Sequence, residues 1–168
     1  MKRIIILTAL FMILLPVTQT KAKTKVPEPT FEETVEAMVR EHKVMLDRLI
    51  AAWEHRKEEI NLLAEVIYHE NWHTDKEHLA AYYTGAVVMN RVNSKAWPNT
   101  VKEVLYQRGQ YSTTKLFYTK EIPQECYDMA RDIYKNGTPD VPENVIFQAM
   151  RPLGKTWKRV NTDYFCYG

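Results

Sequence analysis

An amphipathic pattern of hydrophobic positions runs through residues 30–57. Its apolar side chains recur at intervals of three and four residues: Phe31, Val35, Met38, Val39, Leu46, Leu49, Ile50 and Trp53. This spacing predicts one apolar side along a helix, and Thr30 followed by Glu33 is a capping-box pattern for its start. The helix can pack on the domain that follows or pair with another chain, and we favour the first. The spacing is not a sustained heptad, so it does not predict a coiled coil.

The remaining chain predicts further helices followed by a small sheet. The predicted helices cover residues 58–71, 76–93, 99–106 and 123–136, and the predicted strands cover residues 145–149 and 157–167. Asn99-Thr100 with Glu103 can cap the short helix, and Gly137 is placed to end the last one. The strands are aromatic and β-branched. Helices followed by a small late sheet indicate the α+β class.

The first residues have the pattern of a secretory signal. Met1-Lys2-Arg3 precedes an apolar run over residues 4–17, and this order is typical of an export signal. The run is shorter than the about 20 residues of a comfortable membrane span. We expect a signal peptide over residues 1–22, cleaved after Ala22, and no stable membrane insertion afterwards. An uncleaved anchor is the alternative.

Composition and charge narrow the class of protein. Of the 168 residues, 45% are hydrophobic and 26% are charged, which fits a globular domain and excludes a disordered or low-complexity chain. Removal of residues 1–22 changes the net charge from +2 to −1, because it takes away three basic residues and no acidic ones. Such a charge does not suggest nucleic-acid binding. After export, Cys126 and Cys166 can form a disulfide or remain as two buried thiols.

Glu70 does not fit its hydrophobic surroundings. On a helix it shares one face with Leu63, Val66 and Ile67. Burial and the negative end of the helix dipole would both disfavour its ionised form. A carboxyl group that keeps its proton in a cleft is what a general acid requires. The alternative is that the helix ends one turn earlier and Glu70 is solvated.

The same segment matches a metal-binding pattern. His69-Glu70-Asn71-Trp72-His73 has the His-Glu-x-x-His order of zinc proteases, where two imidazoles one helical turn apart bind the metal. The extended form of that motif fails, because its later Gly and His positions are Lys76 and Leu79. Glu103 is a candidate third ligand that nothing else marks. A zinc metallopeptidase is therefore the alternative function.

Four segments in a fixed order carry a resemblance. They read Leu-Leu-Ala-Glu-Val-Ile-Tyr-His-Glu at 62–70, Ala-Val-Val-Met-Asn-Arg-Val-Asn-Ser at 86–94, Trp-Pro-Asn-Thr-Val at 97–101 and Tyr-Gln-Arg-Gly-Gln-Tyr-Ser at 106–112. This series resembles the cell wall hydrolase family of the SleB type, which includes spore cortex-lytic enzymes. The resemblance covers residues 59–168 and implies that this segment is the catalytic domain, with residues 23–58 as linker and amphipathic helix.

The resemblance implies a mainly helical catalytic domain of the lysozyme and lytic transglycosylase kind, with a small antiparallel sheet near the C-terminus. It implies that Glu70 is the catalytic acid and base. The implied reaction cleaves the β-1,4 bond between N-acetylmuramic acid and N-acetylglucosamine in peptidoglycan strands, with a 1,6-anhydro product. Such an internal attack needs a single Glu, whereas ordinary glycosidases need two carboxylates, and the sequence marks no second one. The implied site has no metal or cofactor, and the implied location is secreted, at the cell wall.

Five more residues are candidates for substrate binding. They are Trp72, Gln110, Tyr111, Ser112 and Gln148. For Tyr111, stacking on a sugar and packing in the core remain equal alternatives. Asn90 and Arg91 lie within a helix, so we expect them to hold the fold. The stretch at 69–74 departs from the Ala-Glu-Ala-Arg-Gly-Glu usual in the family, which puts a role for the second acidic position in doubt. A non-catalytic glycan-binding module is the third hypothesis.

Overall fold

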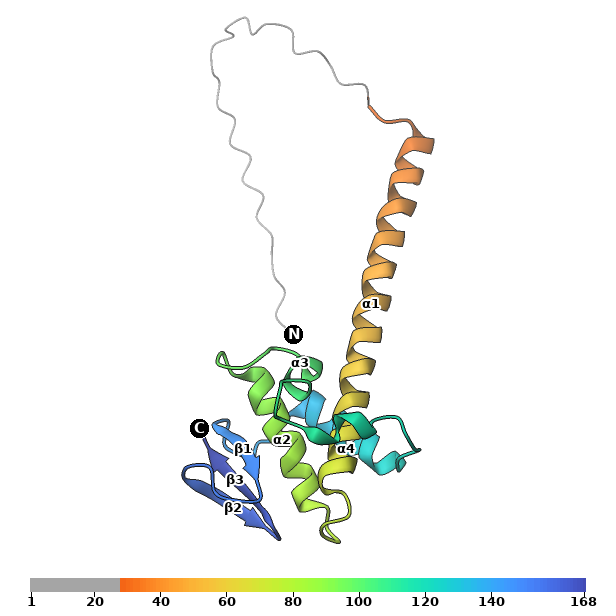
Figure 1. Ribbon diagram of the computed structural model, residues 1–168. Coiled ribbons are helices and arrows are strands. Elements are labelled where there is room, and N and C mark those ends of the chain that lie inside the picture. Colours follow the sequence, from red (N-terminus) through yellow and green to blue (C-terminus); the bar gives the residue numbers. More distant parts are fainter. Residues whose placement is uncertain (1–27) are drawn as a thin grey trace, which may run out of the picture. The chain divides into compact units, whose positions relative to one another are not determined.

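A computed structural model describes residues 28–168 of the chain (Figure 1). The chain divides into two units, Met1–His42 and Lys43–Gly168. The predicted signal peptide and the start of the predicted linker lie outside the described residues. Within residues 28–168, no helix combines the length and the apolar character that a membrane crossing needs.

Helix α1 covers Phe31–Asn71 without a break. Its start is the predicted capping box: Thr30 N donates to Glu33 Oε2 at 2.7 Å, and Glu33 N donates to Thr30 Oγ1 at 3.2 Å. The prediction of two helices meeting near residue 58 is wrong. Residues 54–59 are Glu-His-Arg-Lys-Glu-Glu, and no Gly or Pro occurs anywhere in α1. Five of these six residues are straight-chain side chains that favour helix, and nothing interrupts the backbone hydrogen bonds.

The apolar side chains of α1 are exposed over residues 44–53. Leu49 and Trp53 are each 61% exposed, so the favoured packing of this stretch on the following domain is wrong. Burial begins at Glu59 and is complete from Leu62 to Ile67. The pattern of residues 44–53 gives the direction of an apolar face but not its partner.

Three further helices surround the buried end of α1 (Figure 1). They are α2 (Leu79–Asn93), α3 (Val101–Leu105) and α4 (Gln124–Asn136), and the 3-10 helix η1 (Ser112–Leu116) lies between α3 and α4. Their apolar side chains form one core with α1. Gly85 of α2 allows a close approach to α1 and α4, because a Cβ there would lie 2.7 Å from Ile133 Cδ1 and 3.1 Å from Ile67 Cδ1. Thr100 caps α3 as predicted, through Glu103 N at 3.2 Å.

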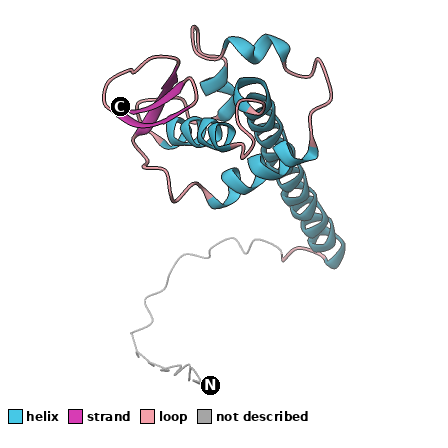
Figure 2. Cartoon of the chain, turned by 90° about the horizontal axis from the view of Figure 1, so that it is seen from below, coloured by secondary structure: helices cyan, strands magenta, loops and turns pink. Residues whose placement is uncertain are grey.

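The C-terminal segment forms a three-stranded antiparallel sheet that lies against α2 (Figure 2). Its strands are β1 (Val145–Ala149), β2 (Thr156–Val160) and β3 (Asp163–Tyr167), in the order β1-β3-β2. The single strand predicted over residues 157–167 is wrong. The chain turns back at Asn161, which has a φ of 51°, a conformation that Asn tolerates better than most residues.

The mainly helical α+β class predicted for the chain is confirmed by these elements. Val145 and Phe165 of the sheet pack on Tyr83 and Val87 of α2 in a second core. Both cysteines are buried and free in this structure, which corresponds to the alternative of two buried thiols. Because α2 contacts both cores, it places the sheet beside the end of α1.

Candidate active site

Glu70 lies at the C-terminal end of α1, one residue before the helix ends at Asn71. The helix therefore does not end a turn earlier, and Glu70 is not simply solvated. Its Oε1 accepts a hydrogen bond of 2.5 Å from Thr113 Oγ1 of η1. Burial raises the pKa of Glu70; the Thr113 hydroxyl lowers it, and the charge of Asp163 raises it further. The net upward shift of the pKa favours the protonated form that a general acid needs.

A cavity of about 140 Å³ opens in front of Glu70. It is lined by side chains from the end of α1, from α2, from the loop after α3 and from the sheet. Its lining is Glu70, Arg91, Gln110, Tyr111, Gln148, Ala149, Met150 and Asp163. Four of the six predicted site residues thus share one cavity, although they come from distant parts of the sequence.

Two predicted site residues lie outside this lining. Trp72 is buried and stacks on His78, with ring centroids 3.7 Å apart and planes inclined by 7°. Ser112 is exposed at the start of η1 and lines a cavity of about 270 Å³, which shares Gln110 and Tyr111 with the first. Trp72 therefore supports the turn after α1 in this structure, while Ser112 lies on a surface that a longer ligand could reach.

Asp163 is a second carboxylate in the cavity, which the sequence did not mark. It is the first residue of β3, and burial raises its pKa while a hydrogen bond from Asn71 lowers it. Nothing near Asp163 in the sequence distinguishes it from a solvated turn residue. Only the return of β3 between β1 and β2 brings its side chain to the end of α1.

The buried amide of Asn71 connects the parts of the cavity. In the orientation that gives both ends of the amide a partner, its nitrogen donates to Asp163 Oδ2 at 2.9 Å and to the Glu70 carbonyl at 3.1 Å. Its oxygen accepts from Gln148 Nε2 at 2.8 Å and from Thr84 Oγ1 at 2.9 Å. Asn71 thereby holds Asp163 and Gln148 in place beside Glu70. The sequence reasoning missed it because its role depends on partners more than 70 residues away.

Two buried polar atoms of the cavity have no hydrogen-bond partner among the described residues. They are the Tyr111 hydroxyl and Gln148 Oε1. Burial raises the pKa of Tyr111 to about 12, so its hydroxyl keeps its proton at neutral pH. A buried polar group without a partner costs about 1–3 kcal/mol. Both atoms are therefore suited to hydrogen-bond a polar ligand in the cavity.

Arg91 connects the strand and the loop that form one side of the cavity. Its Nε donates to the Ile146 carbonyl at 2.7 Å and its Nη1 donates to Gln110 Oε1 at 2.9 Å. Its guanidinium also lies over the rings of Trp97 and Tyr111, at 4.3 and 5.4 Å from their centroids. These contacts agree with the expected structural role. They also place Gln110, so Arg91 links the fold to the site.

The two histidines of the zinc pattern do not form a metal site. His69 Nε2 lies 3.3 Å from Glu65 Oε2, and its ring stacks on Phe117. His73 lies beyond the end of α1 and packs its ring edge against Tyr68, so the helical spacing of the motif is lost. Within residues 28–168, no three His, Cys, Asp or Glu side chains form a group able to hold a metal ion.

Comparisons with known proteins identify a family for the C-terminal part of the chain. Residues 77–165, just over half of the chain, match the family model described as Cell Wall Hydrolase. The matched segment contains Arg91, Gln110, Tyr111, Gln148 and Asp163, and it begins seven residues after Glu70. No curated protein and no solved structure matches the chain.

Proposed function

The chain belongs to the cell wall hydrolase family, and from that premise we propose that it cleaves the β-1,4 bond between N-acetylmuramic acid and N-acetylglucosamine of peptidoglycan, with Glu70 as the acid. The support is one observation: a carboxyl group whose pKa is raised by burial faces a polar cavity. A carboxyl group in such an environment can donate a proton to a glycosidic oxygen near neutral pH.

We propose a lytic transglycosylase reaction. Glu70 donates its proton to the leaving oxygen as the bond to the anomeric carbon breaks. The 6-hydroxyl group of the same sugar then attacks that carbon and gives its proton to the Glu70 carboxylate. The acid is regenerated and a 1,6-anhydro end forms without water. The Thr113 hydroxyl, at 2.5 Å from Oε1, keeps the carboxyl group oriented through both steps.

The presence of Asp163 in the cavity supports hydrolysis as a second candidate reaction. Glycosidases that use water require a second carboxylate, either to activate the water or to act as the nucleophile. Asp163 lines the same cavity as Glu70 and is held there by Asn71. In this reaction Glu70 protonates the leaving oxygen and Asp163 takes a proton from the attacking water. The product then carries a reducing end.

Mass analysis of digested peptidoglycan separates the two reactions. Purified peptidoglycan is incubated with the protein, and the ends of the released fragments are identified. We expect 1,6-anhydro ends; reducing ends would overturn the transglycosylase reaction in favour of hydrolysis. The Glu70→Gln variant should release neither product while still sedimenting with cell walls. Full activity of this variant would overturn the assignment of Glu70.

We also propose that the protein acts outside the cytoplasm. The support is the basic and apolar pattern of residues 1–22 and the extracytoplasmic position of the substrate. Mass measurement of the protein from culture medium and from the wall fraction tests this. A mature chain that begins at Lys23 is expected, and a chain that still begins at Met1 would contradict cleavage.

A further inference from the structure

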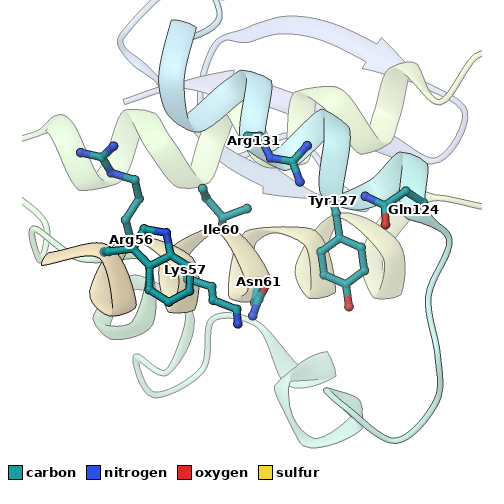
Figure 3. A pocket seen from close by; sticks show the side chains of 8 residues that line it. Arg56, Lys57, Ile60, Asn61, Gln124, Tyr127 and Arg131 are labelled. Atoms are coloured by element: carbon teal, nitrogen blue, oxygen red, sulfur yellow. The ribbon is translucent and has the colours of Figure 1, made fainter. Parts of the chain in front are cut away.

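A larger cavity, of about 420 Å³, lies between α1 and α4 (Figure 3). All of its lining belongs to the unit Lys43–Gly168, and it shares no residue with the cavity of Glu70. From Asn61, the last α1 residue of its lining, to Glu70 is roughly 14 Å along the helix axis at about 1.5 Å per residue. A ligand here would therefore hold a part of a polymer other than the bond that is cleaved.

The lining of this cavity carries positive charge and no carboxylate. Its basic side chains are Arg56 and Lys57 of α1 and Arg131 of α4. Arg131 pairs with the exposed Asp128 at 2.7 Å, while Arg56 and Lys57 form no ion pair within residues 28–168. Local charge of one sign around a hollow attracts a ligand of the opposite sign. The cavity is thus suited to an anionic group.

Flat apolar surfaces lie beside these charges. Figure 3 shows the side chains of Arg56 and Lys57 on α1 opposite Tyr127 and Arg131 on α4, with Ile60 between them. Trp53 is 61% exposed, and Lys57 Nζ lies 5.2 Å from the centroid of its ring. A guanidinium group pairs a carboxylate through two parallel hydrogen bonds, while aromatic rings contact methyl groups and backbone. This combination fits a short peptide with several carboxylates.

We propose that this cavity binds the carboxylate-bearing peptide stems of peptidoglycan. The inference rests on the proposed function, which places the protein on this polymer. Stem peptides carry carboxylate groups beside small apolar residues, and the lining carries cations beside apolar side chains. With a mature net charge of −1, the protein has no general attraction to an anionic wall, so local cations supply the contact. The cavity would hold the enzyme on the wall while Glu70 acts on the glycan.

The test measures sedimentation with purified walls in the Glu70→Gln background, so that cleavage does not alter the substrate. The triple variant Arg56→Gln, Lys57→Gln, Arg131→Gln is compared with Lys43→Gln, Lys95→Gln, Lys135→Gln, which removes three exposed charges outside the cavity. Three walls are used: intact, stripped of covalently attached phosphate polymers, and stripped of stem peptides by an amidase. All six side chains are exposed, so thermal unfolding should show both variants folded.

We expect the cavity variant to bind intact and phosphate-free walls about tenfold more weakly, since each exposed charge contributes modestly. It should bind stem-free glycan as well as the control does. Equal loss in the two triple variants, or a loss that persists on stem-free glycan, would overturn the proposal. A loss seen only while phosphate polymers are present would assign the cavity to phosphate and also overturn it.

Cleavage of stem-free glycan strands by variants with intact Glu70 is measured in parallel. If the wild-type chain does not cleave the strands but the cavity variant loses wall binding, the proposed glycosidase fails and the binding site stands. If cleavage occurs and wall binding is unchanged, the binding site fails alone.

Discussion

Glu70 and Asp163 line one cavity, although one ends the first helix and the other begins the last strand. The negative charge of Asp163 raises the pKa of Glu70. Two carboxyl groups that share a cavity ionise less readily together than apart. Burial, and after it the charge of Asp163, therefore raise the pH up to which the acid form of Glu70 is available.

Replacing Asp163 by Asn should shift the alkaline limb of the pH profile of kcat/KM toward lower pH. Removal of the negative charge lowers the pKa of Glu70, so its acid form is lost at a lower pH. If Asp163 activates water, the variant should instead lose activity by roughly 100-fold to 10,000-fold at every pH. An unchanged profile would show that the carboxylate has no influence on the acid.

Replacing Thr113 by Val should shift the same limb in the opposite direction. The Thr113 hydroxyl stabilises the ionised form of Glu70 through the 2.5 Å hydrogen bond, so its loss raises the pKa. Thr114→Val is the matched control, because the Thr114 hydroxyl donates to the Tyr111 carbonyl and not to Glu70. A shift of equal size in the control would attribute the effect to the loop.

Glu70→Gln should unfold at a higher temperature than the wild type at neutral pH. The pKa of Glu70 is raised in the folded state. Between the pKa of this group in the unfolded chain and its pKa in the folded chain, the folded chain holds a proton that the unfolded chain has lost. The stability of the wild type therefore falls as the pH rises through that interval. The two curves should converge near and below pH 4, where Glu is protonated in both states. Thermal unfolding from pH 4 to 8 measures this, and a constant difference across the range would contradict it.

Tyr111→Phe should lower kcat/KM by about tenfold without loss of stability. The hydroxyl is buried with no partner among the described residues, so its removal leaves the free energy of unfolding unchanged or raises it by about 1 kcal/mol. A hydrogen bond from this hydroxyl to the substrate stabilises the bound complex by about the same free energy, so its loss lowers kcat/KM. Denaturant unfolding and kinetics on the same samples test whether the free energy of unfolding is kept while kcat/KM falls. A destabilised variant would mean that the hydroxyl has a structural partner.

Arg91→Lys should destabilise the fold by about 1–3 kcal/mol and raise KM. The shorter, unbranched cation cannot reach the Ile146 carbonyl and Gln110 Oε1 together, and a partly buried carbonyl left unpaired carries this cost. Arg108→Lys, at an exposed position, should change stability by less than about 0.5 kcal/mol. Denaturant unfolding compares the two variants, and equal effects would remove the assigned role of Arg91.

Local sequence patterns were sufficient wherever neighbours within a few residues decide the structure. The capping boxes at Thr30 and Thr100, the end of α4 at Gly137 and the burial of Glu70 at the end of α1 follow from short-range hydrogen bonds and helical period. The same reasoning failed at element boundaries. It divided α1, where no residue breaks the helix, and it joined β2 to β3 across Asn161.

The sequence by itself determined an α+β chain, a carboxyl group at the end of an apolar helical face and four of the eight residues that line its cavity. Only the tertiary structure decided that Asp163, Asn71 and Thr113 surround that acid and that Trp72 does not line the cavity. The reason is physical: periodicity encodes which side of an element is buried, whereas the partners of a buried polar group depend on strand pairing and loop return between residues far apart in the chain.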